Sequence, residues 1–243
     1  MIQVWTHLNW TRFLDCFIAL PEYISSCSRN DPNLNECALK SARASLHKFS
    51  LGDTGRGLDP LDPLFVPVMT VYLPNENGLK LVFINNSFTG LSALRLDDLK
   101  FDLTKKLISA DALVTLDVQS KYDLSGKLLV IPIKSSGDSS IKLKNANLHI
   151  RFWYEHVKCD DGEIHWKITK HDIKYEVERA TFRLENLLND KNVGDQVNKF
   201  LNEMWREIVA DVGPSICQSL SAAVVQNLDK LLAQVPYSEL LPE

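Results

Sequence analysis

The stretch that decides the fold is "ADALVTLDVQSKYDLSG", residues 110–126, in which apolar and polar side chains alternate. One face of an extended chain here carries Ala112, Val114, Leu116, Val118, Tyr122 and Leu124. The positions between them carry Thr115, Asp117, Gln119, Lys121 and Asp123. Because successive side chains of a strand point to opposite faces, this pattern predicts a long β-strand with one buried and one solvated face.

The two-residue period extends from about residue 65 to about residue 185. It returns in "NLHIRFWYEH", residues 147–156, and in "EIHWKIT", residues 163–169. The apolar phase then shifts near Glu178, between two runs: Ile173, Tyr175, Val177 and then Ala180, Phe182, Leu184. A β-bulge near Glu178 is the simplest cause, and bulges bend a sheet. We therefore expect a long, antiparallel and strongly curved sheet.

From residue 193 onward the period becomes helical. The first apolar stripe, in residues 193–212, consists of Val193, Val197, Phe200, Leu201, Met204, Trp205, Ile208 and Val212. After Gly213-Pro214 the stripe continues through Ile216, Leu220, Val224, Leu228, Leu231 and Val235. If the two parts are nearly collinear, this helix is ~60 Å long. Such a helix beside one-faced strands predicts an α+β fold in which a curved antiparallel sheet wraps a long C-terminal helix.

The segment "CSRNDPNLNEC", residues 27–37, places two cysteines around the start of a short N-terminal helix, expected over residues 31–48. Asp31 and Pro32 suit the N-cap and first turn of that helix. Nine residues separate Cys27 from Cys37, whereas zinc and redox motifs use shorter spacings. We expect a disulfide that pins the preceding segment to the helix and contributes about 2 to 3 kcal/mol.

A disulfide implies an oxidising compartment. Residues 1–20 contain a short apolar run around Cys16 that resembles an atypical secretory signal, interrupted by Asp15. Removing it leaves one domain over residues 21–243 and four cysteines. The alternative is an ordinary N-terminal helix in an intracellular protein. In the secretory pathway the triplets at Asn9 and Asn85 are candidate N-glycosylation sites.

The composition narrows the class of protein. The 243 residues are 45% hydrophobic and carry a net charge of -4, which suits a sizeable globular core. A slightly acidic chain argues against nucleic-acid binding, which needs clustered Lys and Arg. No run approaches the 18 apolar residues of a membrane span, so we expect a soluble protein that does not insert stably into membranes.

Three motifs resemble the takeout and juvenile hormone-binding family of insects, which is related to the tubular lipid-binding proteins. They are "LPEYISSCSRNDPNLNEC" (20–37), "GRGLDPLDPLFVP" (55–67), and "NLLNDKNVGDQVNKFLNEMWREI" (186–208) with "VPYSELLP" (235–242). The resemblance covers about residues 20–243. It implies an apolar tunnel between helix and sheet, a small hydrophobic ligand, and a link to circadian rhythm.

Six aromatic residues on inward phases or on the helix are the candidate ligand-binding residues: Phe152, Tyr154, Trp166, Tyr175, Phe200 and Trp205. From residue types alone, filling a core explains such aromatics better than binding. The family resemblance favours binding for the set. A tyrosine among them is expected to orient the polar head of a ligand.

The sequence offers no catalytic or cofactor motif, with no G-x-S-x-G, P-loop, G-x-G-x-x-G or H-E-x-x-H. The best metal candidates are His156, Cys159 and His165, around a turn at residues 160–162. A three-residue loop pairs Cys159 with Glu163 and turns His165 to the other face of the sheet from His156. These three side chains therefore do not converge, and we expect neither metal nor cofactor.

Two functions stay open. The first is a secreted, monomeric carrier that sequesters a juvenile hormone, fatty acid or related terpenoid without catalysis. The second is an extracellular interaction or signalling protein whose tunnel is filled by side chains or structural lipid. An even cysteine count, and a second bond in the hormone-binding branch of the family, also suggest a Cys159–Cys217 disulfide.

Overall fold

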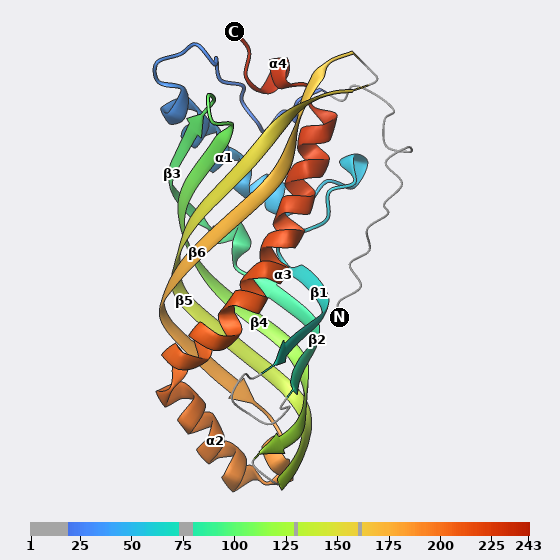
Figure 1. Cartoon of the computed structure of the whole chain (residues 1–243), viewed down its shortest axis with the longest axis vertical. Helices are drawn as coiled ribbons and strands as arrows, with labels where there is room; N and C mark the ends of the chain where they lie inside the picture. The colour runs from blue at the N-terminus through green and yellow to red at the C-terminus, as the bar shows by residue number, and fades with distance from the viewer. Residues whose placement is uncertain (1–18, 73–79, 129–130, 160–161) are drawn as a thin grey trace.

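The computed structural model describes residues 19–72, 80–128, 131–159 and 162–243 (Figure 1). Residues 1–18, which make up most of the candidate signal segment, lie outside the described residues. Cys16 and Asn9 belong to this part of the chain. One antiparallel sheet has the order β1-β2-β4-β5-β6, and β3 pairs with β4. The strands are β1 Leu64–Tyr72, β2 Lys80–Thr89, β3 Arg95–Asp102, β4 Leu107–Leu128, β5 Ile131–Lys158 and β6 Ile164–Leu184. The predicted fold class is confirmed, although the sheet bends without closing.

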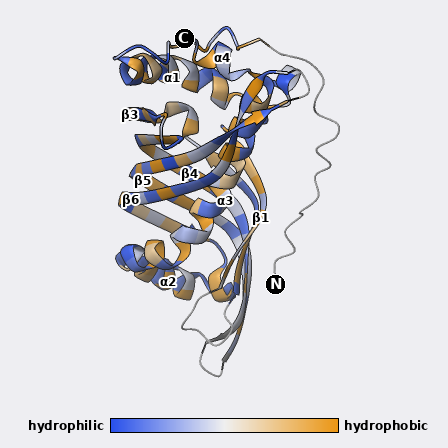
Figure 2. Cartoon of the chain, turned by 45° about the horizontal axis from the view of Figure 1, so that its top comes forward, coloured by the Kyte–Doolittle hydropathy of each residue, from blue (hydrophilic) through white to orange (hydrophobic). Residues whose placement is uncertain are grey.

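The alternation predicted for residues 110–126 is confirmed in β4. Its apolar positions Ala112, Val114, Leu116, Val118 and Tyr122 are all buried. The polar positions between them face the other side of the sheet, and Figure 2 shows the same alternation of hydrophobic and hydrophilic residues along β5 and β6. Burial of one face is what holds the register, because a slip by one residue would expose it.

The phase shift near Glu178 is real, but the irregularity that accompanies it lies in β5. Glu178 and Arg179 are both exposed, between inward positions Val177 and Ala180, and the ladder between β5 and β6 keeps its register here. The ladder between β4 and β5 shifts between Val114 and Leu116. Asn145, in β5 opposite Glu178, takes a left-handed φ of 48°, which marks the bulge.

The turn between β5 and β6 has the predicted register. Cys159 and Glu163 are joined by a backbone hydrogen bond of 3.0 Å, and Gly162 has a positive φ of 87°. His156 lies opposite Trp166. His165, next to Trp166 in β6, therefore points to the opposite face from His156, so these side chains do not form one metal site.

The C-terminal helical region differs from the single long helix expected. It consists of α2 Lys191–Glu203 and α3 Trp205–Gln234, separated at Met204, and Figure 1 shows that their directions differ. Gly213 and Pro214 lie inside α3. With 30 residues, α3 is ~45 Å long. It contacts both edge strands, β6 and β1, and so spans the open side of the sheet.

Two asparagines attach α2 to the edge of β6. The Asn198 side chain bonds both the N–H and the carbonyl of Leu184, each at 2.8 Å. Asn202 bonds the N–H and carbonyl of Phe182 at 2.9 and 2.7 Å. These four bonds satisfy edge groups that would otherwise be open to another chain. They also fix the rotation of α2 about its axis.

α3 is long and apolar enough to cross a membrane by length and composition alone, which the sequence analysis did not expect. Only 11% of the residues in its most apolar stretch are buried. Ile208, Val212 and Ile216 pack against the core formed with β1 and β2, so part of the apolar surface of α3 is left uncovered.

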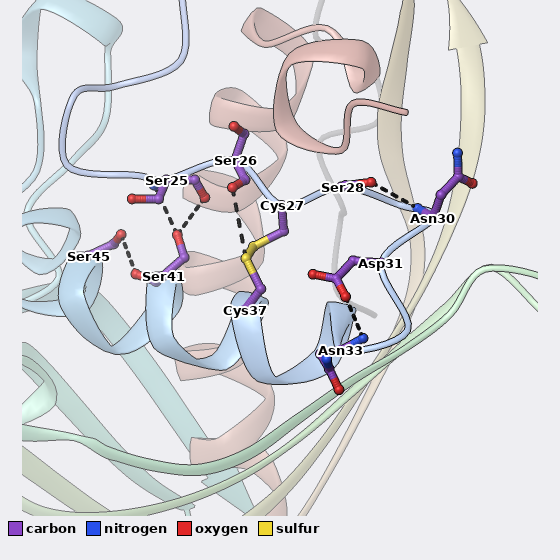
Figure 3. Close-up of a disulfide and its surroundings, with 10 residues drawn as sticks. All are labelled: Ser25, Ser26, Cys27, Ser28, Asn30, Asp31, Asn33, Cys37, Ser41 and Ser45. Atoms are coloured by element: carbon purple, nitrogen blue, oxygen red, sulfur yellow. Dashed lines mark hydrogen bonds between the residues drawn. A yellow bond between two sulfur atoms is a disulfide. The ribbon is translucent and has the colours of Figure 1, made fainter.

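The N-terminal helix α1 Leu34–Ser50 begins three residues later than predicted. The Asp31 carboxylate accepts the N–H of Asn33 at 2.8 Å, so it caps a turn before the helix rather than the helix itself. The predicted disulfide between Cys27 and Cys37 is present, with a Cα–Cα distance of 5.9 Å (Figure 3). Ser41 adds two hydrogen bonds to the backbone of Ser25.

The disulfide also supports the C-terminus. The Cys27 N–H donates to the carbonyl of Leu240 at 3.3 Å, and the Arg29 N–H donates to that of Pro242 at 2.8 Å. The short helix α4 Tyr237–Leu240 thereby lies beside the stapled segment.

Replacing both Cys27 and Cys37 with serine is expected to lower the free energy of unfolding by about 2 to 3 kcal/mol, because the unfolded chain regains loop entropy. Residues 237–243 should also become sensitive to limited proteolysis. Urea unfolding and proteolysis followed by mass spectrometry measure both effects. Cys217→Ser is the control, and an equal loss of stability in that variant would show that the effect is not due to the staple.

The suggested Cys159–Cys217 disulfide is wrong for this structure, which does not join these two residues. Cys159 pairs with Glu163 just before the start of β6. Cys217 lies on α3 near Asp172 and Tyr175. The nine positions between Glu163 and Asp172 span about 30 Å of strand, whereas a disulfide needs Cα atoms within about 7 Å.

Candidate functional site

The face of the sheet turned toward α3 carries an apolar surface that is only partly covered. On β5, which lies between β4 and β6, Leu143, Leu148 and Ile150 point to this face and remain half-buried. The facing side chains of α3 are also half-buried: Ile216, Leu220, Ala223 and Val224. A filled protein interior would bury such positions, because cores leave few gaps. We call these residues the inner surface.

Aromatic rings gather where the inner surface approaches the disulfide. Tyr154 stacks on Trp166 with ring centroids 4.3 Å apart. Phe101 and Tyr237 lie against Trp166 at 6.0 and 5.5 Å, and His156 lies 4.8 Å from Tyr237. We call these five residues the aromatic end. It joins the inner surface, since Leu148, Ile150, Phe152 and Tyr154 follow one another on one face of β5.

The structure thus brings together two of the predicted site residues, Tyr154 and Trp166, each 3% exposed. Burial raises the pKa of Tyr154 to about 12, with smaller contributions from Tyr237 and Asp102. The Tyr154 hydroxyl is therefore protonated at neutral pH. The guanidinium of Arg29 lies 5.2 Å from the ring centroid of Tyr237 and pairs with Glu243 at 2.6 Å.

Tyr175 faces α3 at the middle of the site. Its hydroxyl donates to the carbonyl of Val209 at 3.3 Å, one residue before Ala210, whose carbonyl lacks an intrahelical partner because Pro214 has no N–H. A Cβ on Gly213 would lie 2.3 Å from the Tyr175 hydroxyl oxygen, so only glycine allows this approach. Burial raises the pKa of Tyr175. Tyr175 therefore joins β6 to α3, and its hydroxyl is already used in this hydrogen bond.

The other predicted residues are dispersed. Phe152 lies half-buried between Tyr154 and Ile150, opposite His171 of β6. Trp205 is 5% exposed, but its ring is covered by the guanidinium groups of Arg179 and Arg206, 5.6 and 4.5 Å from its centroid. Trp205 therefore packs at the junction of α2, α3 and β6.

Phe200 is 59% exposed, and its expected place on the inward stripe is wrong. It lies two residues, or about 200°, from each of the asparagines that bind β6. That rotation turns Phe200 and Val193 outward, where they line an open hollow of about 430 Å³ along α2.

A serine and a histidine meet between α3 and β6, with Ser221 Oγ 3.2 Å from His171 Nε2. The Ser221 hydroxyl also donates to the carbonyl of Gln218 at 3.0 Å, an arrangement that suits the His171 tautomer with its proton on Nε2. A serine activated as a nucleophile donates to its histidine instead. The contact between Ser221 and His171 joins α3 to β6.

Comparison with known proteins decides the family. The model of the haemolymph juvenile hormone binding protein (JHBP) family matches residues 8–242. The chain belongs to this family. The circadian clock-controlled protein daywake of Drosophila melanogaster is 29% identical over 98% of this chain and 95% of its own length. A putative beta-carotene-binding protein of Schistocerca gregaria is 21% identical over 90% of this chain and 88% of its own.

A solved structure supports the JHBP fold. The crystal structure of Takeout 1 from Epiphyas postvittana superposes with a TM-score of 0.81, at 26% identity, over 90% of this chain and all of that one. The JHBP family is a ligand-binding family, so the partly covered inner surface is the place to seek a small hydrophobic ligand in this member.

Sequence reasoning missed two members of the aromatic end, Phe101 and Tyr237. Tyr237 lies in the "VPYSELLP" motif that supports the JHBP resemblance, and this was the available signal. Phe101 lies in β3 and is 65 positions from Trp166 in the chain. Its neighbourhood follows from the pairing of β3 with β4, of β4 with β5 and of β5 with β6.

Proposed function

We propose that this protein is an extracellular carrier that holds a small hydrophobic molecule between α3 and the sheet, without catalysis. The observation that carries the proposal is the half-buried state of apolar residues on the interior strand β5, such as Leu143 and Leu148. Burying apolar surface is favourable by about 25 cal/mol per Å². A ligand that covers these residues and removes them from water is therefore stabilised. Juvenile hormones, fatty acids and related terpenoids are small molecules with a large apolar part.

The extracellular assignment is supported by the Cys27–Cys37 disulfide, since such bonds persist in oxidising compartments. The name of the family refers to haemolymph. We also propose N-glycosylation at Asn85, whose side chain is exposed at a bulge of β2. A glycan at this position would project into solvent.

Native mass spectrometry of the protein purified from its own tissue tests the proposal. A reproducible bound molecule of a few hundred daltons, lost on extraction with organic solvent, is expected. A preparation whose mass always equals that of the glycosylated chain alone would contradict it.

The second candidate, an extracellular interaction protein, is favoured by the open apolar side of α2, where Val193, Phe200 and Met204 are exposed. The two candidates differ in the same experiment. An interaction protein would carry no exchangeable ligand and would co-purify with a protein partner, and Phe200→Ser would release that partner.

A further inference from the structure

The indole N–H of Trp166 is a buried donor. The residue is 3% exposed, and its Nε1 has no hydrogen-bond partner within the described part of the chain. Buried tryptophans usually bond this group. Leaving a buried donor unbonded costs free energy. A native protein that retains such a donor usually uses it in its function.

The neighbours of Trp166 hold its ring in place without bonding its nitrogen. Tyr154 stacks on one face, and Phe101 and Tyr237 lie at a tilt to it. The strand beneath is fixed by the ladder that pairs Trp166 with His156. The donor is therefore preorganised, which reduces the entropy cost of binding an acceptor.

Trp166 stands where the inner surface ends. Its apolar cluster includes Leu232 from the last turns of α3 and Ile108 from β4. Leu99 packs against this cluster and also against the cluster of Leu148 and Ile150. An extended molecule lying on the inner surface would bring one end to the aromatic end.

We propose, building on the proposed function, that Trp166 Nε1–H donates a hydrogen bond to a carbonyl oxygen at one end of the ligand. The ligand is thus an ester or ketone with a long apolar remainder that lies along the inner surface. An uncharged acceptor fits, because burying an ionised carboxylate among these rings would cost more than a neutral carbonyl. The guanidinium of Arg29, which lies over the Tyr237 ring, is already paired with Glu243 at 2.6 Å. Trp166 determines the orientation and class of the ligand.

Indole N–H signals of the intact wild-type protein test the contact directly. Two-dimensional ¹⁵N NMR is recorded with methyl palmitate and with the hydrocarbon octadecane, each delivered from cyclodextrin. Methyl palmitate should move the Trp166 signal downfield relative to octadecane, while the signal of Trp205 should stay unchanged. An identical Trp166 shift with both probes would overturn the proposal.

Binding of the same probes to variants supplies the second measurement, by displacement of the fluorophore N-phenyl-1-naphthylamine. Trp166→Phe keeps an aromatic ring and loses the donor. It should weaken the binding of methyl palmitate about 3- to 10-fold, which corresponds to the loss of one hydrogen bond. The binding of octadecane should stay unchanged. Trp153→Phe, in the neighbouring strand, is the control and should change neither.

The outcomes separate the two proposals. Equal weakening of both probes in Trp166→Phe would make the residue a packing group, so the inference would fail while the carrier function stands. If neither probe binds the wild-type protein, the carrier function fails. If Trp166→Phe does not fold, the NMR comparison on the wild-type protein still decides.

Discussion

Ala223→Phe is expected to lower the affinity for a hydrophobic ligand by on the order of 100-fold and to leave the free energy of unfolding of the ligand-free protein nearly unchanged. Ala223 is half-buried on the side of α3 that faces the sheet. The added ring would displace about four methylene groups of ligand, each contributing ~0.8 kcal/mol, or about 3 kcal/mol in total. Fluorophore displacement and urea unfolding measure the two quantities.

Ala222→Phe is the matched control, because Ala222 is the next residue and is exposed. It should change neither quantity. If the interior is already filled, Ala223→Phe would instead overpack it and cost about 1 to 3 kcal/mol of stability. That loss, together with unchanged ligand binding, would exclude the carrier.

Trp205→Ala has the largest expected effect on stability. The ring is buried, and its removal should lower the free energy of unfolding by about 3 to 5 kcal/mol, the range for large-to-small aromatic changes. Because Arg179 and Arg206 cover the ring, the cavity would form at the junction of helices and strand. Ligand affinity of the molecules that still fold should therefore be unchanged.

Trp153 provides the comparison for Trp205. Arg151 and Lys170 also lie over its ring, at 5.4 and 4.9 Å, but Trp153 is only half-buried. Trp153→Ala should lower the free energy of unfolding by less than Trp205→Ala does, because less of the Trp153 side chain is buried. If Trp205→Ala instead changes affinity or chain-length preference with little loss of stability, Trp205 belongs to the ligand site after all.

Local pattern was enough for much of this fold. The alternation in residues 110–126 defined which face of β4 is buried. The pairing of Cys159 with Glu163 defined the register of β5 on β6 as far as the shift between Trp153 and Tyr154. The spacing of Cys27 and Cys37 defined the staple. These features depend on contacts close in the chain or on a strict two-residue period, so the residues themselves specify them.

Only the tertiary structure decided what covers each face. The helical period placed Phe200 and Trp205 on one stripe, but the bonds of Asn198 and Asn202 to β6 rotate α2 so that Phe200 faces outward. Periodicity also did not show that Phe101 and Tyr237 meet Trp166. A pattern gives the direction of a side chain relative to its own helix or strand, whereas its neighbours depend on pairing between distant segments, and that pairing assembled the aromatic end.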